Sequence, residues 1–401
     1  KRMSNKVDPH LIRELEEFGL KDAGKCYNCG TCTAICNLAT PENPFPRKLV
    51  RYIQLGQREK ILRSPEPWLC YYCGDCSTRC PRGADPGETM MVLRRYLTSL
   101  YDWTGFARKF YTSETFEIIA VAIVGVLIGI GLLIFHSGPI NWTHADLNSV
   151  WPAAEIEKAD LVMAAILTFF LLSNAFRCVK IVMGDYFKKV PLGMYLSELK
   201  FMLTQFCTQK QFGKCKDRPQ WIVHLAIMTG YSTVFLLVVI CVNGLPFMGV
   251  DFLKFQRGWA SLGGHIEYSI FHPIRLLGYY SFCAIMYGTT YAMIGRLRKS
   301  KPQYKNSHGT DWMFLILLQL TAMTGIFINF TRLLDWPLAT YAIYVIHMMV
   351  AIPMLVLEVP FAKWAHLAYR PIVLMLLSVK EKYIAEHAQA EGAVLAAKSA
   401  A

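Results

Sequence analysis

The sequence predicts a mainly α-helical protein, with a cysteine-rich N-terminal domain followed by a bundle of six membrane-spanning helices. Two observations predict this class. Eight of the thirteen cysteines fall within residues 26–80, and long apolar segments occupy residues 116–379 of the 401-residue chain. Because composition changes sharply at these limits, we expect three parts. They are a cytoplasmic domain over 1–110, a membrane domain over 111–379 and a polar, alanine-rich cytoplasmic tail over 380–401.

The eight N-terminal cysteines form two runs with one spacing, Cys-x2-Cys-x2-Cys-x3-Cys. This is the spacing of bacterial ferredoxins with two [4Fe–4S] clusters, in which the last cysteine of each run binds the other cluster. The spacing therefore predicts an α-helical ferredoxin-like domain with two clusters and two ligand sets. The sets are Cys26, Cys29, Cys32 and Cys80 for the first cluster, and Cys70, Cys73, Cys76 and Cys36 for the second.

Other roles fit the two runs less well. A disulfide framework would need an oxidising compartment and a secretory signal, and we expect neither here. Structural zinc would use two pairs of cysteines rather than regular triplets. No Cys-x-x-Cys is followed by histidine, which excludes attachment of a c-type haem. The pattern therefore indicates electron transfer.

Six apolar segments are long enough to cross about 30 Å of hydrocarbon, which takes about twenty helical residues. They are residues 118–135, 161–176, 221–242, 268–294, 312–331 and 337–357. The first has no charged residue, and the fourth is interrupted only by His272 and Arg275. We expect each to be a transmembrane helix.

Lysine and arginine predict the orientation of these helices. The loops 177–218 and 296–305 are rich in both residues, whereas 136–160 and 244–264 have few. Because positive loops stay in the cytoplasm, we expect a multi-pass protein of the inner membrane with both termini cytoplasmic. The same insertion signal accounts for the formal net charge of +13. We therefore expect membrane lipid, but no nucleic acid, among the partners.

Four histidines lie in or next to the apolar segments. Ionisable residues inside a membrane are functional candidates, and neutral imidazole is an axial ligand of haem iron. By depth, His224 and His366 lie near the cytoplasmic face, and His272 and His347 near the outer face. We expect each pair to hold one b haem. A helix–helix hydrogen bond is the alternative for each histidine, and His265 is the alternative to His272.

The spacing of His347 and His366 does not suit a straight helix. Nineteen residues rise about 28 Å and overshoot a whole number of turns by about 100°. Pro353 and Pro360 lie between the two histidines. We therefore predict a kink or a single wide turn near one of these prolines, which would bring both side chains to the same face.

The segment 347–366 has, in order, a histidine, a Pro-Phe pair, a lysine and a second histidine. It resembles the last helix of the nitrate reductase gamma family of di-haem cytochrome b subunits. That family has two haem ligands on one early helix, where this chain has only His224, so the assignment of His272 rests on depth.

The N-terminal domain, with Gly30-Thr31 and Trp68-Leu69-Cys70, resembles the C subunit of heterodisulfide reductase. The segments 221–224 and 272–278 resemble the membrane E subunit of the same enzyme. A fusion of such parts resembles the C subunits of quinone-interacting membrane-bound oxidoreductase complexes. This resemblance implies menaquinone as substrate, cytoplasmic partner subunits with flavin and iron–sulfur groups, and adenylylsulfate reductase downstream in sulfate reduction.

The expected function is electron transfer between menaquinol and those partners, as the electron-transfer subunit of an oxidoreductase and without a catalytic residue of its own. A quinone site needs a polar anchor near the apolar slot. The outer candidates are Glu267, Tyr268 and Arg275, and the inner candidates are Glu358 and Lys363.

Two other functions are alternatives, and two more fit the sequence poorly. The chain would also suit the membrane subunit of a heterodisulfide reductase or another respiratory complex, or a membrane anchor without haem that bears a ferredoxin domain. A catalytic disulfide reductase would have Cys-Cys-Gly motifs, whereas Tyr71 and Tyr72 follow Cys70. A transporter would show internal repeats, and none is evident.

Overall fold

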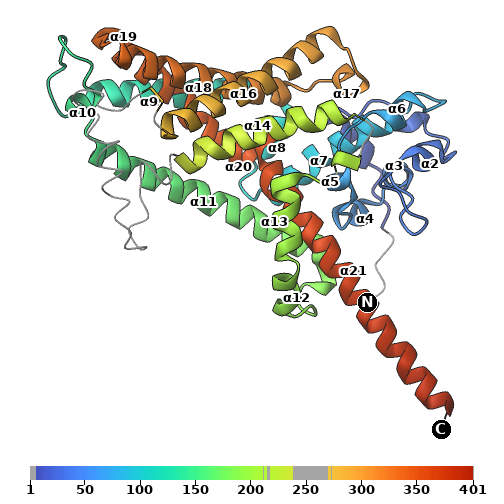
Figure 1. The fold of residues 1–401 in the computed structure, drawn as a ribbon. Coiled ribbons are helices and arrows are strands. Elements are labelled where there is room, and N and C mark those ends of the chain that lie inside the picture. The colour runs from blue at the N-terminus through green and yellow to red at the C-terminus, as the bar shows by residue number, and fades with distance from the viewer. Residues whose placement is uncertain (1–5, 211, 215–216, 238–269, 272, 401) are drawn as a thin grey trace.

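The computed structural model describes residues 6–210, 212–214, 217–237, 270–271 and 273–400. These residues are mainly helical and contain no strand (Figure 1). The prediction of a mainly α-helical protein is therefore confirmed. The small N-terminal helices lie at one side of the molecule, next to a layer of long helices (Figure 1).

The N-terminal domain consists of short helices around one longer helix. The short helices are α1 (Leu11–Glu17), α2 (Thr31–Ile35), α3 (Arg47–Gln54), α4 (Arg58–Leu62), α5 (Glu66–Leu69) and α6 (Asp75–Thr78). The longer helix is α7 (Pro86–Tyr101), where Asp85 accepts a hydrogen bond from the Glu88 amide at 3.1 Å. Such a cap satisfies an amide of the first turn. Buried apolar side chains of α1, α3 and α7 form the core.

This domain packs onto two later helices through an aromatic cluster. Trp68 of α5 and Tyr101 of α7 surround Tyr369, with ring centres 5.6 and 5.1 Å from it. All three rings are almost fully buried, and burying one such side chain contributes about 1.5–3 kcal/mol. The cluster, which also includes Cys178 and Val182 of a later helix (153–183), therefore fixes the cysteine-bearing domain against both helices.

Five segments of the described residues are long and apolar enough to cross a membrane. They lie in α9 (Glu114–Ile134), α11 (Ala153–Met183), α14 (Arg218–Leu237), α18 (Gly309–Leu333) and the run from α19 (Pro337–Pro353) to Phe361. The fourth expected span contains α16 (Pro273–Arg298), which is 26 residues long but less apolar because it has several tyrosines. The six-helix count therefore stays a prediction.

The predicted irregularity between His347 and His366 is confirmed. A π-helical turn over Met354–Glu358 follows Pro353, and α20 (Val359–Phe361) then ends at Ala362, which leaves helical geometry. A short 3-10 turn leads into α21 (His366–Ala400). Proline lacks an amide, so the α-helical bonds to the Met349 and Val356 carbonyls are missing at Pro353 and Pro360, and the chain leaves regular helical geometry between them.

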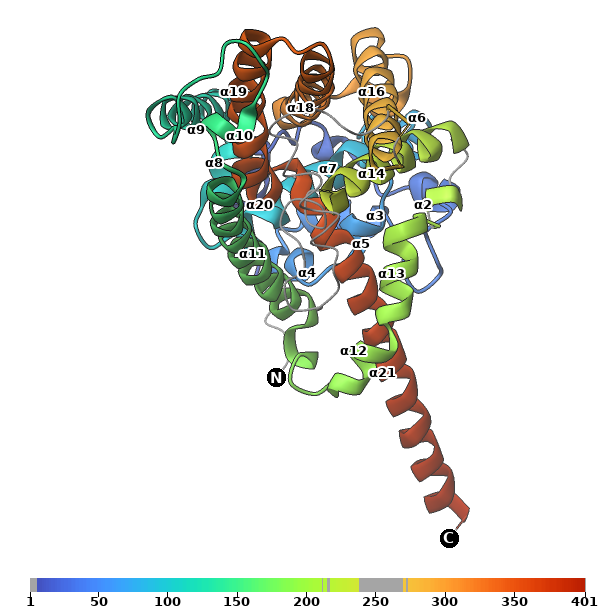
Figure 2. The same ribbon diagram turned by 60° about the vertical axis from the view of Figure 1, so that its left-hand side comes forward.

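The last helix, α21, extends beyond the rest of the molecule, and the predicted tail over 380–400 continues it (Figure 2). Two short helices, α12 (Leu192–Ser197) and α13 (Leu199–Thr208), pack along it. Glu198, between them, accepts a hydrogen bond from Ser378 at 2.8 Å. The expected loop 177–218 is therefore partly helical and is held against α21.

Candidate functional site

The two cysteine runs fold into loops of the same shape. The residue before the second cysteine of each run, Asn28 or Tyr72, has a positive φ. The residue after the second cysteine is Gly30 in the first run and Gly74 in the second, with φ of 90° and 82°. Glycine adopts this left-handed geometry at little cost, which lets the chain wrap around a compact centre. Each glycine then starts a short helix, α2 or α6, that bears the third cysteine.

Backbone amides point at the sulfurs of both loops. Asn28 donates to Cys26 Sγ at 3.4 Å, and Tyr72 donates to Cys70 Sγ at 3.3 Å in the corresponding position. Ala84 donates to Cys80 Sγ at 3.4 Å. Amide hydrogen bonds to sulfur stabilise the charge of a thiolate and raise the potential of a cluster held by it. The loops therefore have the electrostatics of a cluster site.

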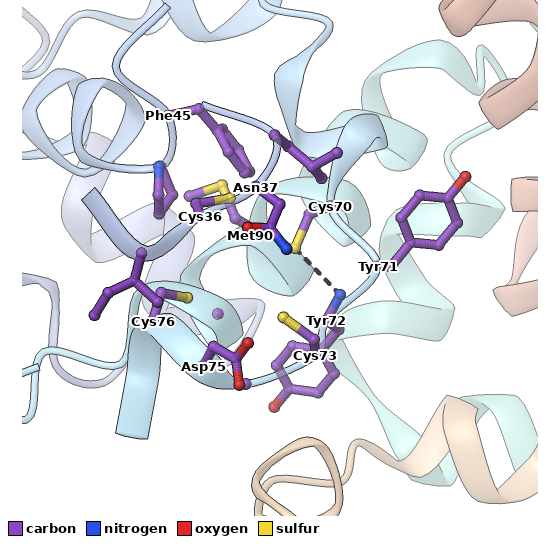
Figure 3. A pocket seen from close by; sticks show the side chains of 15 residues that line it. Cys36, Asn37, Phe45, Cys70, Tyr71, Tyr72, Cys73, Asp75, Cys76 and Met90 are labelled. Carbon is purple, nitrogen blue, oxygen red and sulfur yellow. Dashed lines mark hydrogen bonds between the residues drawn. The ribbon is translucent and has the colours of Figure 1, made fainter. Parts of the chain in front are cut away.

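The thiols fall into the two expected neighbourhoods. Cys36, Cys70, Cys73 and Cys76 line one pocket, and Figure 3 shows their sulfurs around the same space. Burial, together with these neighbouring thiols, raises the pKa of Cys36 to about 11. In the other group, Cys32 interacts with Cys26 and Cys80. The last cysteine of each run thus lies with the other run, as ligand exchange requires.

Cys29 differs from the other members of its predicted set. Its thiol is exposed and hydrogen-bonds with Thr31 Oγ1 at 3.4 Å, which lowers the pKa of the thiol.

No three His, Cys, Asp or Glu side chains of the described residues converge closely enough to hold one metal ion. In a cubane each cysteine binds a different iron, so its sulfurs stand farther apart than in a single-ion site. The arrangement fits a cluster better than it fits zinc.

The structure brings together the two histidines predicted near the cytoplasmic face. The ring centres of His224 (α14) and His366 (α21) are 6.2 Å apart. His224 Nδ1 donates to Gln209 Oε1 at 2.8 Å, and His366 Nδ1 donates to the Lys363 carbonyl. Such bonds fix the tautomer that leaves Nε2 unprotonated, as a metal-binding histidine needs.

A direct contact joins the second cysteine run to the helix of His366. Arg370 lies one turn after His366 and donates from Nη2 to the Cys70 carbonyl at 2.7 Å. Arg94 of α7 donates to the same carbonyl and, at 2.8 Å, to the Pro67 carbonyl. Two guanidinium groups therefore converge on the backbone of a cluster-binding cysteine.

An aromatic path runs beside this contact. The side chain of Tyr71 points away from the sulfurs in Figure 3. Its ring is stacked on Phe212 at 4.5 Å between centres, and the Arg370 guanidinium lies 3.5 Å from its centre. Phe212 in turn meets the ring of His224 at 5.7 Å. Consecutive contacts thus link Cys70 with the histidine pair.

The predicted outer site is described only in part. His265, Glu267, Tyr268 and His272 lie outside the described residues. His347 is described. The Thr324 hydroxyl donates to the Leu320 carbonyl at 2.7 Å, so it accepts from His347 Nδ1 at 2.8 Å, which again leaves Nε2 available. Arg275 is 7% exposed, and its Nη1 has no hydrogen-bond partner among the described residues.

Sequence reasoning missed the side chains that lie between the cysteine loops and the His224–His366 pair. Arg370 follows His366 by four residues, so it lies on the same helix face, and this spacing was a visible signal. Its contact with Cys70 spans 300 residues of sequence, and no local pattern predicts such a contact. Phe212 and Gln209 precede α14 and gave no signal at all.

Comparison with known proteins agrees with the geometry of the cysteine loops. Residues 25–84 match the family described as "4Fe-4S dicluster domain", a range that includes all eight cysteines. The N-terminal part of this chain is a 4Fe-4S domain like that of the heterodisulfide reductase C subunits. It is an iron–sulfur electron-transfer domain.

Three relatives illustrate the similarity. A protein of Archaeoglobus profundus that is named for its likeness to the C subunit of heterodisulfide reductase is 32% identical over 101 residues, which cover 25% of this chain and 54% of that protein. The iron–sulfur C subunit of the CoB–CoM heterodisulfide reductase of Methanopyrus kandleri is 27% identical over 143 residues, 34% of this chain and 66% of that protein. The C subunit of the ferredoxin:CoB-CoM heterodisulfide reductase of Methanosarcina acetivorans is 38% identical over 84 residues, 21% of this chain and 32% of that protein.

The chain thus spans about half of the first relative, two thirds of the second and a third of the third. No solved structure matches it. The family match covers residues 25–84, and the five helices that are long and apolar enough to cross a membrane lie outside that range.

Proposed function

We propose that this chain is the membrane subunit of a quinone-linked oxidoreductase complex, with two [4Fe–4S] clusters, two b haems and menaquinone as substrate. Its partners are cytoplasmic subunits with flavin and iron–sulfur groups, and adenylylsulfate reductase is the downstream acceptor. When bound, haems and clusters supply one-electron carriers, and the protein positions them and sets their potentials. The observation behind the proposal is the chain of contacts from Cys70 through Tyr71 and Phe212 to His224.

The fit of a haem iron to the histidine pair rests on distance and hydrogen bonding. Metal–nitrogen bonds to histidine are about 2 Å, so two imidazoles on opposite sides of one iron have ring centres about 6 Å apart. The 6.2 Å between His224 and His366 suits this arrangement. A cavity at this site is also lined by Arg94, Arg296 and Lys363, whose positive charge would attract the propionates of a haem, and Arg296 and Lys363 would share this role with their contacts to Asp311.

The cysteines would hold the clusters in the two sets expected from ligand exchange. Cys70, Cys73, Cys76 and Cys36 would bind the cluster nearer the membrane histidines, because Cys70 and Tyr71 make the connecting contacts. Arg94 and Arg370 place positive charge next to Cys70 and would stabilise an added electron there. The second pair of histidines is proposed as His272 and His347, and the quinone anchors as Glu267, Tyr268 and Arg275.

A reduced-minus-oxidised optical spectrum of the purified chain tests the proposal. We expect a b-type haem band that menaquinol reduces, and about eight irons in clusters for each two haem irons. His224→Ala and His366→Ala should each remove about half of the haem, whereas His387→Ala, in the exposed part of α21, should remove none. A protein that has clusters but no haem would instead be a membrane anchor with a ferredoxin domain.

The relatives favour a second assembly. Their printed names place them in heterodisulfide reductases, so this chain would also suit the membrane subunit of a complex of that kind. Co-purification distinguishes the two: adenylylsulfate reductase bound through flavin-containing subunits supports the first, and a heterodisulfide-reducing partner the second.

A further inference from the structure

Two buried carboxyl groups lie next to each other where α9 meets the π-helical turn. Glu117, in the first turns of α9, is 1% exposed, and Glu358, at the end of the turn, is 0% exposed. The two carboxyls interact directly with each other. The π-helical turn directly follows α19, which lies side by side with α9 in Figure 2.

The oxygens of this pair are short of hydrogen-bond donors. Among the described residues, both oxygens of Glu358 lack a hydrogen-bond partner. Oε1 of Glu117 lacks one as well. Buried polar groups are nearly always paired, so an unpaired carboxylate oxygen calls for a donor. A proton on one carboxyl would supply it.

Among the described residues, no cation is one of the main charges that act on either carboxyl. Phe116, Phe170, Leu357 and Phe361 form the apolar cluster next to the pair. The strongest other charges that act on Glu117 are themselves acidic, Glu114 of the same helix and Asp311 of α18.

Cations are present in the region but are engaged elsewhere. Lys363 forms an ion pair with Asp311 at 2.6 Å, and Arg296 lies 3.9 Å from the same carboxylate. Arg95 of α7 pairs with Glu88. Tyr111 of α8 (Phe106–Thr112), which also faces the pair, is buried and contributes a neutral hydroxyl. Two adjacent carboxylates repel each other in such surroundings, and a proton shared between them relieves this repulsion.

We propose that Glu117 and Glu358 form a proton-binding site within the membrane domain, in which the two carboxyls share at least one exchangeable proton at neutral pH. The bound ligand is the proton itself: loading forms one O–H bond on a carboxylate oxygen, and release returns the proton to water. The site lies beyond the proposed electron-transfer function and does not depend on it, since the pair would bind its proton in any redox state.

The wide turn explains how the site arises. The Val359 amide bonds to the Met354 carbonyl across the π turn, and Glu358 is the last residue of that turn. The extra residue rotates the chain after it by about 100° relative to a regular helix. Such single π turns are common at functional sites, because they re-aim side chains at a modest cost.

Infrared spectroscopy of the full chain in detergent tests the proposal, because only a protonated carboxylic acid gives its characteristic C=O stretch. We expect this band in the wild type at neutral pH, and a downshift in heavy water, because the proton exchanges. In E117Q and in E358Q the band should move, since the partner of the remaining acid changes from a carboxylate to an amide. The double variant should lack the band.

Glu155→Gln is the matched control, because Glu155 is exposed on α11 and pairs with Lys158 at 2.8 Å. It should leave the band unchanged. The proposal is wrong if the wild type shows no such band, if the band does not exchange, or if it stays unmoved in both single variants. Circular dichroism checks that each variant is folded, and the wild-type and single-variant spectra decide the matter even if the double variant does not fold.

Discussion

At the scale of single residues, Arg370 has the most specific position between the two sites. Its guanidinium donates to Cys70 and covers Tyr71, while its helix also bears His366. We predict that Arg370→Gln lowers the midpoint potential of the cluster on Cys70 by roughly 30–60 mV, because a nearby positive charge favours the added electron. A redox titration followed by electron paramagnetic resonance measures this shift.

Arg13→Gln is the control for that experiment, because the side chain of Arg13 is exposed and water screens its charge. This variant should have the same midpoint potential as the wild type within experimental error. An unchanged potential in Arg370→Gln would mean that the group bound at Cys70 is distant from this guanidinium.

The exchanged cysteines give a second residue-scale prediction. Cys36→Ser should remove iron from the cluster of Cys70, Cys73 and Cys76 and leave the other cluster in place, because Cys36 lies among those thiols. Cys178→Ser should remove none, because Cys178 is buried in the apolar cluster between α11 and α21. Iron analysis measures both variants. Equal iron loss in the two would contradict the ligand assignment.

At the scale of elements, α9 and α19 depend on close packing. A Cβ atom at Gly125 would lie 2.7 Å from the Met349 carbonyl oxygen, which the backbone holds in place. Packing of small residues is a main source of helix association in membranes. We predict that Gly125→Ala destabilises the protein by about 1–3 kcal/mol, the usual cost of overpacking.

Gly131→Ala on the same helix is the matched control, because a Cβ there would meet nothing within 4 Å. Alanine also has the higher helix propensity, so this variant should be neutral or slightly stabilising. Thermal unfolding in detergent compares the two. Similar unfolding temperatures for both variants would show that α9 does not pack on α19 as described.

The start of α18 predicts a dependence of stability on pH. His308 Nδ1 accepts a hydrogen bond from the Thr310 amide at 3.3 Å, and burial lowers the pKa of His308 to about 4. The folded state therefore binds this proton less readily than the unfolded state, whose pKa is about 6.5. The stability that the neutral ring provides is present above about pH 6.5 and is lost as the pH falls toward 4.

Between pH 6.5 and pH 4 the free energy of unfolding of the wild type should fall by about 1–3 kcal/mol more than that of His308→Asn. Asparagine keeps a cap for the helix but does not titrate. Thermal unfolding at several pH values measures the difference. Identical pH profiles for the two proteins would show that His308 does not contribute.

The elements also show how far sequence reasoning reaches. The cysteine loops were predictable because cluster ligation imposes a local spacing, and the wide turn because nineteen residues do not fit a straight helix between two aligned histidines. Glu117 was missed because the predicted span began one residue later, at the first purely apolar position. Its partner Glu358 had been considered only as a quinone candidate. Which residues meet across helices depends on packing, and a single sequence does not show it.

At the scale of the whole molecule, the position of α16 decides the topology. This helix has several tyrosines, and two of their hydroxyls bond to neighbouring helices. Tyr280 hydrogen-bonds with Thr229 of α14 at 2.7 Å, and Asn329 of α18 donates to Tyr279 at 3.4 Å. Polar side chains paired in this way are tolerated between helices in a membrane. We therefore predict that α16 crosses the membrane as a sixth span.

With six spans both ends of the chain lie on one side of the membrane, and with the five most apolar helices alone they lie on opposite sides. Reporters fused before residue 6 and after residue 400 test this, since one reporter type is active only in the cytoplasm and another only outside. We expect both ends to be cytoplasmic, because the loops 177–218 and 296–305 are rich in lysine and arginine and such loops stay in the cytoplasm. If the two ends are found on opposite sides, the number of spans is odd, and α16 does not cross the membrane. The His224–His366 pair would remain in the same place, because α14 and α21 meet on the side of the cysteine domain.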